Sequence, residues 1–517
     1  MLSAAEGEDF WGAVAQRAAQ HGNLRWAAAI QAFCVRTDNL IIKAHILAGV
    51  KRALGATVIA LKAPDDLLDA SEQERVSGSN IDDVSNIEQL FQRLNQQGTK
   101  LDGEELAFSM IKAYWRELEE PVNKASESRM PSARMASLSV RTALAKTAKQ
   151  NLPGPQSVGA IREIARGNEA KKTSVETFIA SDLSQTCATV DRWLKYDKDS
   201  NPGGLLPVHV TSIGMGSRDV YLLMLHLASR ADETAVPSCW GKRMQALATL
   251  LHWFARDKTK AANRVFEACR GDISVANIRA GLLNATEKGE VYILKTPAEL
   301  ESFLSRPEVN IAVWNWWRLI YKDTDANGNE VQHGEWEGLL NFRGNRELLL
   351  YAQRHYLASR FSDYNPARKD LWEAHNRPWD FDHILPHKYF CNRKDWAPFM
   401  GLCQQWGYTI GNLRAWPFED NRSDQMTLAK EKIKGNAELL AASFMTADDE
   451  QHFSRGDDVR KKEPEVRLFI SACRSRLVRI YREWYDSMEI AELLPAPKSF
   501  DAPTGNHAGI DKMEQPS

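Results

Sequence analysis

Two histidines and two aspartates stand close together in the stretch RPWDFDHILPHKYF, residues 377–390. Histidine has an ordinary pKa close to neutral pH, so it can serve as a general base or bind a transition metal. His383 and His387 are four residues apart, the spacing of two zinc ligands on one helix face. Pro386 disfavours a helix between them, and the glutamate that a zinc-protease helix requires is missing. We therefore predict a strand that carries Asp382 and His383 and runs into a loop.

A second polar stretch follows in YTIGNLRAW, residues 408–416, which alternates as a strand entered through Gly411. The next residues, PFEDNRSDQMTLAKEKIK, combine a proline, several capping residues and a basic helical pattern. The predicted order is strand, loop, strand and helix, which is a ββα unit. In chain order this unit presents His383, Asn412 and Asn421.

These residue types suit the hydrolysis of a phosphodiester bond. The reaction needs a base to activate water and a hard cation to neutralise charge in the transition state. His383 is the predicted base, and Asp382 and Asn421 supply oxygen ligands for Mg²⁺ or Mn²⁺. Asp424 or Asp420 completes the predicted ligand set. Asn412 is expected to bridge backbone groups and to fix the loop that carries the histidine.

Cations near this unit are candidates for contacts with DNA phosphates. The predicted contacts are Arg414, Lys430 and Lys432. Each polar residue also has an ordinary structural interpretation: Asn412 as a turn residue, Asn421 as a helix cap. The constellation is more specific than any of its members, and it predicts a metal-dependent nuclease.

The whole chain has an ordinary globular composition, with 517 residues, of which 43% are hydrophobic and 26% charged. No apolar run reaches the length of a membrane span, and the N-terminus lacks the pattern of a secretion signal, so we expect a cytoplasmic protein. The seven cysteines form no Cys-x-x-Cys pair, which argues against a disulfide framework or a structural zinc site. The net charge is −2, but residues 121–175 carry ten Lys or Arg against three Glu. This segment is either a basic face for phosphates or a solvated helix face.

The two motif regions resemble a known family. PWDFDHILP, followed by IGNLRAWP and a lysine-bearing helix, resembles the C-terminal HNH domain of the GmrSD-type modification-dependent restriction endonucleases. LFQRLNQQGTKLDGEEL, residues 90–106, is similar to a segment in the N-terminal ParB-like, nucleotide-binding domain of the same family. The resemblance implies a bacterial defence nuclease that cleaves invading, often modified, phage DNA. It places the nuclease motif at His383, Asn412 and Asn421.

The same resemblance implies a nucleotide-binding segment at Phe91, Asn95 and Gly98. The family's Asp-Gly-Gln-Gln-Arg motif is missing, and only ninety residues precede Phe91. We therefore expect a truncated N-terminal domain that hydrolyses neither GTP nor ATP appreciably.

The predicted fold is α+β and mostly helical. The expected parts are a partial ParB-like domain at 1–120, a helical connector at 121–320, an HNH nuclease domain at 321–495 and a disordered tail at 496–517. Two alternatives stay open: a catalytically silent protein that binds DNA or regulates a partner, and a toxin-like RNA nuclease. Oligomerisation is compatible with either.

Overall fold

The structure is a computed structural model that describes most of the chain beyond residue 102. The described residues are 103–231, 240–292, 294–305, 310–311, 319–324, 330–335, 342–367, 377–391, 399–423 and 426–494, with isolated positions 16, 19 and 28. The chain divides after Lys100, and every element named below belongs to the second unit, Leu101–Ser517. The predicted nucleotide-binding residues Phe91, Asn95 and Gly98, the candidate ligand Asp424 and the tail at 496–517 lie outside the described residues.

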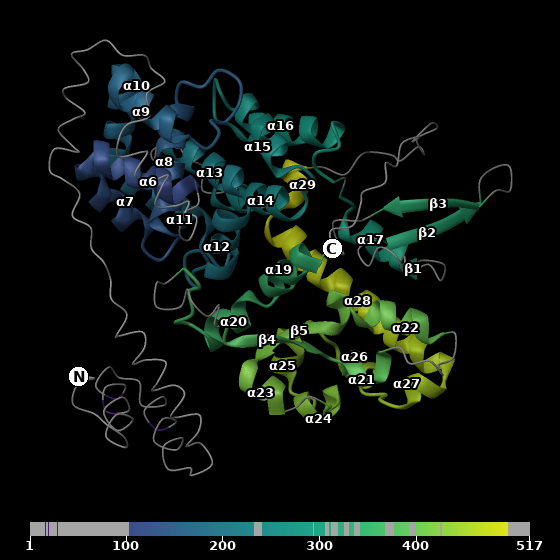
Figure 1. Ribbon diagram of the computed structural model, residues 1–517. Helices are drawn as coiled ribbons and strands as arrows, with labels where there is room; N and C mark the ends of the chain where they lie inside the picture. Colours follow the sequence, from purple (N-terminus) through teal and green to yellow (C-terminus); the bar gives the residue numbers. More distant parts are fainter. Residues whose placement is uncertain are drawn as a thin grey trace, which may run out of the picture. The chain divides into compact units, whose positions relative to one another are not determined.

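The described part of the chain is mostly helical with small antiparallel sheets, which confirms the predicted fold class (Figure 1). The helices of its first half are α6 (Gly103–Tyr114), α7 (Glu119–Ser126), α8 (Ser132–Ala145), α9 (Val158–Gly167), α10 (Glu169–Thr177), α11 (Leu183–Leu194), α12 (Pro207–Gly216), α13 (Arg218–Arg230), α14 (Trp240–Trp253), α15 (Lys258–Ala268), α16 (Val275–Glu287) and α17 (Pro297–Leu304).

The centre of this helical region is formed by α13 and α14. Every residue from Val220 to Ala228 is buried, and so is every residue from Arg243 to Trp253. Helices that are buried on nearly all sides are typical of the middle of a helical core. In the loop between α8 and α9, the Ser157 hydroxyl accepts a hydrogen bond of 3.2 Å from the Ala160 amide and caps α9.

Two small sheets follow. Strands β1 (Asn310–Ile311), β2 (Leu319–Thr324) and β3 (Glu330–Glu335) form an antiparallel sheet in that order. Strands β4 (Trp379–His383) and β5 (Leu413–Pro417) form an antiparallel pair. The helices of this half are α19 (Phe342–Ala352), α20 (Arg354–Arg360), α21 (His387–Phe390), α22 (Met400–Gly407), α23 (Phe418–Ser423), α24 (Ala429–Ile433), α25 (Ala437–Ala442), α26 (Ala447–Phe453), α27 (Asp458–Lys461), α28 (Glu463–Ser487) and α29 (Ile490–Leu493).

The longest of the described helices is α28, which runs near the strand pair (Figure 1). Its buried side chains recur every three or four residues, as an amphipathic helix requires. This face packs against α17, α19, α22, α26 and α27 and against the 3₁₀ turn Ile410–Asn412 that leads into β5. The helix therefore joins most of the elements around the strand pair.

Helix α19 joins the strand pair to the helical region. Its Glu347 carboxylate lies 3.0 Å from His252 Nε2 and accepts a hydrogen bond of 2.6 Å from Trp253 Nε1, both on α14. Ser212 on α12 donates to the same carboxylate. One cluster of buried apolar side chains extends from Ala107 to Leu494. The three-domain division expected from the sequence stays a prediction.

Membrane-spanning helices were expected to be missing. None of the helices in the described ranges combines the length and the apolar character needed to cross a bilayer.

Candidate active site

His383 is the last residue of β4, where the strand pair ends. In the antiparallel register it lies opposite Leu413, the first residue of β5, and Asp382 lies opposite Arg414. After His383 the chain leaves the sheet at Ile384 to Pro386 and enters the short helix α21. The prediction of a strand running into a loop at this point is confirmed.

The imidazole of His383 is half-buried in a ring cluster. Its centroid lies 5.2 Å from the ring of Phe390 and 6.1 Å from the rings of both His387 and Tyr408. Burial lowers the pKa of His383 to about 4; the Asp382 carboxylate opposes this shift, and His387 adds to it. The ring is therefore neutral near pH 7, and its low pKa makes it a weaker proton acceptor than an ordinary histidine.

His387 is exposed and has a separate partner. Its Nε2 lies 2.8 Å from the hydroxyl of Tyr408. Among the described residues, no hydrogen bond is made to either ring nitrogen of His383. The two histidines thus share a ring cluster but differ in burial and in hydrogen bonding.

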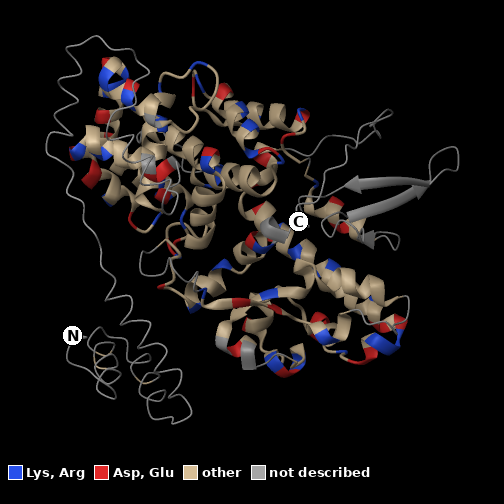
Figure 2. Ribbon diagram, in the orientation of Figure 1, with Lys and Arg blue, Asp and Glu red and all other residues tan. Residues whose placement is uncertain are grey.

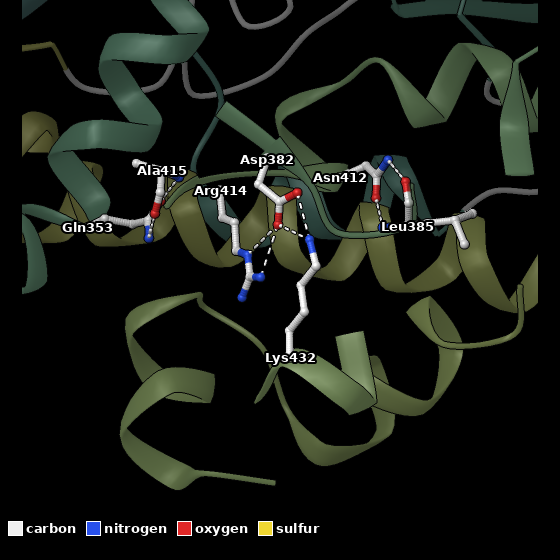
Figure 3. Close-up of polar contacts among 7 residues, drawn as sticks. All are labelled: Gln353, Asp382, Leu385, Asn412, Arg414, Ala415 and Lys432. Atoms are coloured by element: carbon white, nitrogen blue, oxygen red, sulfur yellow. Dashed lines mark hydrogen bonds and ion pairs between the residues drawn. The ribbon is translucent and has the colours of Figure 1, made fainter. Parts of the chain in front are cut away.

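Asn412 is completely buried and ties the loop after His383 to the start of β5 (Figure 3). Its Nδ2 donates to the carbonyls of Leu385 (3.1 Å) and Gly407 (3.0 Å), and its Oδ1 accepts from the Leu385 amide (2.8 Å). The carboxamide thus satisfies three backbone groups that no strand pairing reaches. These contacts confirm that Asn412 bridges backbone groups, as expected. Its role in catalysis stays a prediction.

The segment before β5 is not the strand that the sequence predicts. Ile410–Asn412 forms a 3₁₀ turn, and the strand begins only at Leu413. Arg476 on α28 contacts this turn: it is fully buried and donates to the carbonyls of Ile410 (2.6 Å) and Gly411 (3.0 Å). These hydrogen bonds hold the Ile410 and Gly411 carbonyls toward α28. A Cβ on Gly411 would also lie 2.5 Å from the Cys473 carbonyl oxygen, so only glycine fits against α28 here.

Asp382 is held by two cations (Figure 3). Its Oδ2 accepts a hydrogen bond of 3.0 Å from Arg414 Nε, and its Oδ1 lies 3.1 Å from Lys432 Nζ. The Arg414 and Lys432 side chains are each 1% exposed, and that of Asp382 is 7% exposed. In this arrangement the two predicted phosphate contacts face the Asp382 carboxylate rather than solvent. Their predicted role in DNA binding is therefore not supported by their positions, and it stays untested.

The remaining predicted residues lie on the helices that follow β5. Asn421 is half-buried on α23, Asp420 beside it is exposed, and Lys430 is exposed on α24. A carboxylate and an amide oxygen, as in Asp382 and Asn421, are donors that suit Mg²⁺ or Mn²⁺. Within the described ranges, no three His, Cys, Asp or Glu side chains gather as a metal site. The predicted ligand set needs Asp424, which lies outside those ranges.

Several cations of the basic segment 121–175 pair with acidic residues outside it. Basic and acidic side chains are interspersed over these helices (Figure 2). Arg129 lies 2.6 Å from Asp191, and Lys146 lies 3.0 Å from Asp182. Arg134 pairs with Glu104, and Arg141 pairs with Asp219. Four of the ten cations thus have acidic partners on other helices.

Two supporting residues were missed from the sequence. Arg476 stands in phase with the buried positions Phe469, Cys473 and Ile480 of α28, so a charge on the apolar face of a helix was the available signal. Gln353 follows α19 and binds both backbone groups of Ala415 in β5. The sequence carries no signal for this contact, since a glutamine between two helices is ordinary.

Comparisons with known proteins identify no relative of this chain. No protein-family model matches this chain, and neither a curated protein nor a solved structure matches it. The family resemblance drawn from the two motif regions therefore stays a prediction.

Proposed function

We propose that this protein is a metal-dependent endonuclease of the HNH type that hydrolyses phosphodiester bonds in DNA. The observation that carries the proposal is the position of His383. Its neutral imidazole ends β4, and the loop that follows is locked by the three hydrogen bonds of Asn412. A general base must combine a free lone pair with a fixed position, and this arrangement supplies both.

In the proposed reaction, His383 accepts a proton from the attacking water. Asn412 has a positioning role. It binds the backbone of Leu385 and so limits how far the loop after His383 can move. Asp382 and Asn421 are the residues that would hold the cation, with Asp420 or Asp424 beside them. The chemistry supplied by a bound Mg²⁺ or Mn²⁺ is neutralisation of the charge that develops on the scissile phosphate.

The resemblance of the sequence to GmrSD-type enzymes supports a biological role. It points to invading phage DNA with modified bases as the substrate and to bacterial defence as the purpose. Lys430, exposed on α24, is the proposed phosphate contact that needs no rearrangement. Arg414 and Lys432 reach a phosphate only after leaving Asp382.

A second candidate is a catalytically silent protein that binds DNA or regulates a partner. The observation in its favour is the pairing of Asp382 with Arg414 and Lys432, since a carboxylate held by two cations is a weaker metal ligand. Such a protein would keep the strand pair and lack cleavage.

A cleavage assay separates these candidates. The purified protein is incubated with unmodified plasmid, phage DNA that carries modified bases, and RNA, each with Mg²⁺, with Mn²⁺ and with EDTA. The proposal predicts cleavage of DNA that EDTA abolishes. Binding of DNA without cleavage in the presence of either Mg²⁺ or Mn²⁺ would favour the catalytically silent protein. Cleavage of RNA alone would indicate a toxin-like RNA nuclease.

A further inference from the structure

Two arginine side chains lie over the ring of Phe381 in β4. The guanidinium carbon of Arg346, on α19, is 4.7 Å from the centre of this ring, and that of Arg377, just before β4, is 5.5 Å from it. The face of an aromatic ring attracts cations, so Phe381 holds both side chains in place. The two guanidiniums are therefore within about 10 Å of each other, although they come from separate segments of the chain.

This arginine pair lies on the same side of β4 as His383. Phe381 and His383 are alternate residues of the strand, so their side chains leave it on one side. Both are partly exposed, whereas Asp382 between them is buried. Burial is the main cause of the low pKa of His383, and the charge of Arg346 adds to it, as does His387. An anion bound by the pair would thus lie beside the proposed general base.

The charges of the pair favour an anion. Burial lowers the pKa of Arg346, the nearby charge of Arg377 lowers it further, and the Asp380 carboxylate opposes both. The same carboxylate accepts a hydrogen bond of 3.1 Å from the Phe381 amide. Guanidiniums stay protonated at neutral pH, so the two arginines outweigh the one carboxylate in this group. Arg377 is exposed, so an anion can reach the pair from solvent.

A phosphodiester fits this site. The planar fork of a guanidinium donates to two phosphate oxygens at once, and such charge-assisted hydrogen bonds are stronger than neutral ones. A bound phosphate would also offset the repulsion between the two arginines. Binding here requires no metal, and Arg414 and Lys432 stay on Asp382.

We propose that Arg346 and Arg377 form a binding site for the phosphate backbone of DNA beside His383. The inference rests on the proposed nuclease function, and it specifies the side of the strand pair that the DNA approaches. The plainer alternative is that both side chains only cover Phe381 with their apolar parts. The two differ in one property, because only phosphate contacts contribute to the salt dependence of DNA binding.

DNA binding to the full chain in EDTA tests the inference without metal and without cleavage. Fluorescence anisotropy of a labelled DNA duplex gives the Kd at several KCl concentrations for wild type, Arg346→Gln and Arg377→Gln. We expect each variant to raise the Kd by about tenfold, as loss of a charged hydrogen bond implies. Each should also reduce the slope of log Kd against log salt concentration by about 0.9. Arg346→Lys keeps the charge, so its slope should equal that of wild type.

Arg256→Gln is the matched control. Arg256 is also an exposed arginine over an aromatic ring, 4.6 Å from the centre of Tyr292, but it belongs to the segment between α14 and α15. Its Kd should lie within about twofold of wild type, with an unchanged slope, because it removes a ring contact of the same kind away from β4.

The outcomes are distinguishable. Unchanged Kd values for Arg346→Gln and Arg377→Gln, while wild type binds DNA, would overturn the phosphate site and leave the nuclease function standing. A higher Kd with an unchanged slope would overturn it too, because the arginines would then act through the fold. If wild type binds no DNA even at low salt, both the site and the proposed DNA substrate are wrong. If Arg346→Gln fails to fold, the exposed Arg377→Gln decides the question alone.

Discussion

The side chain of Gln353 pairs with Ala415 as a neighbouring strand would. Its Oε1 accepts a hydrogen bond of 2.7 Å from the Ala415 amide, and its Nε2 lies 3.4 Å from the Ala415 carbonyl. Nε2 also donates to the carbonyl of Ala442 at the end of α25 (3.0 Å). A strand edge carries unpaired backbone groups, and here one buried carboxamide satisfies them at the position opposite Phe381.

Gln353→Leu should destabilise the protein by roughly 1–3 kcal/mol. Leucine leaves the Ala415 amide and carbonyl buried without partners, which costs more than the hydrogen bonds themselves contributed. The free energy of unfolding in urea measures the effect. Gln451→Leu on the exposed side of α26 is the control and should lie within about 0.5 kcal/mol of wild type. Equal stabilities of the two variants would show that Gln353 does not support β5.

Arg476→Met should be among the most destabilising single changes, costing about 3 kcal/mol or more. The guanidinium donates to the carbonyls of Ile410, Gly411 and Ser443, so the substitution removes three buried hydrogen bonds, although the Leu413 amide still donates to the Ile410 carbonyl. Thermal unfolding followed by circular dichroism measures the loss. Arg467→Met on the same helix is the control, because that side chain is 72% exposed and makes a surface ion pair with Glu463. A small effect of Arg476→Met, similar to the control, would mean that another group orders the 3₁₀ turn.

Asn412→Ala and Asn421→Ala should differ in how they respond to Mg²⁺. Asn412→Ala removes three hydrogen bonds to the backbone, so it should lower stability and the maximal cleavage rate without changing the Mg²⁺ concentration for half-maximal rate. Asn421→Ala should raise that concentration, because it removes a proposed oxygen ligand. Titrations of cleavage rate against Mg²⁺ test both. An unchanged titration curve for Asn421→Ala would reassign the ligand to Asp420 or Asp424.

Acid should weaken the link between α19 and the helical region. Burial lowers the pKa of His209 to about 4, although Glu347 opposes the shift. Burial alone would raise the pKa of Glu347, but His252, His209 and Ser212 outweigh it and hold this pKa at about 2. Lys258, which lies 3.3 Å from His252, is a further cation facing the cluster.

Both groups bind protons more readily in the unfolded chain, so both destabilise the fold as pH falls. The contribution of His209 is complete above about pH 6.5 and is lost as pH falls to about 4; that of Glu347 is complete above about pH 4.5 and is lost toward pH 2. Urea unfolding from pH 7 to pH 3 should show falling stability. Glu347→Gln should flatten the part below pH 4.5, whereas Glu431→Gln on the surface of α24 should not. Identical profiles for the two variants would contradict the role of Glu347.

The sequence predicted the parts of this site that depend on local chemistry. Pro386 limits how far β4 can extend, so a strand that carries His383 and then runs into a loop could be predicted. The mostly helical fold was also predicted from the sequence.

The parts that depend on distant residues could not be predicted. The 3₁₀ turn at Ile410–Asn412 is bound by Arg476, more than sixty residues further along the chain. Lys432 reads as a surface cation on a basic helix, because a sequence gives the residue type and not its burial. Its contact with Asp382 joins residues fifty positions apart. Lys432 was expected to contact phosphate and Asp382 to bind a metal, but the two side chains are buried against each other.

The central claim is that His383 is the general base, and His387 provides a matched control in the same ring cluster. Single-turnover cleavage of DNA with saturating Mg²⁺ is compared for wild type, His383→Ala and His387→Ala, with folding checked by circular dichroism. We predict that His383→Ala cleaves on the order of 10² to 10⁴ times more slowly than wild type, and that His387→Ala cleaves within about tenfold of wild type. A folded His383→Ala variant that cleaves at the wild-type rate would contradict the account.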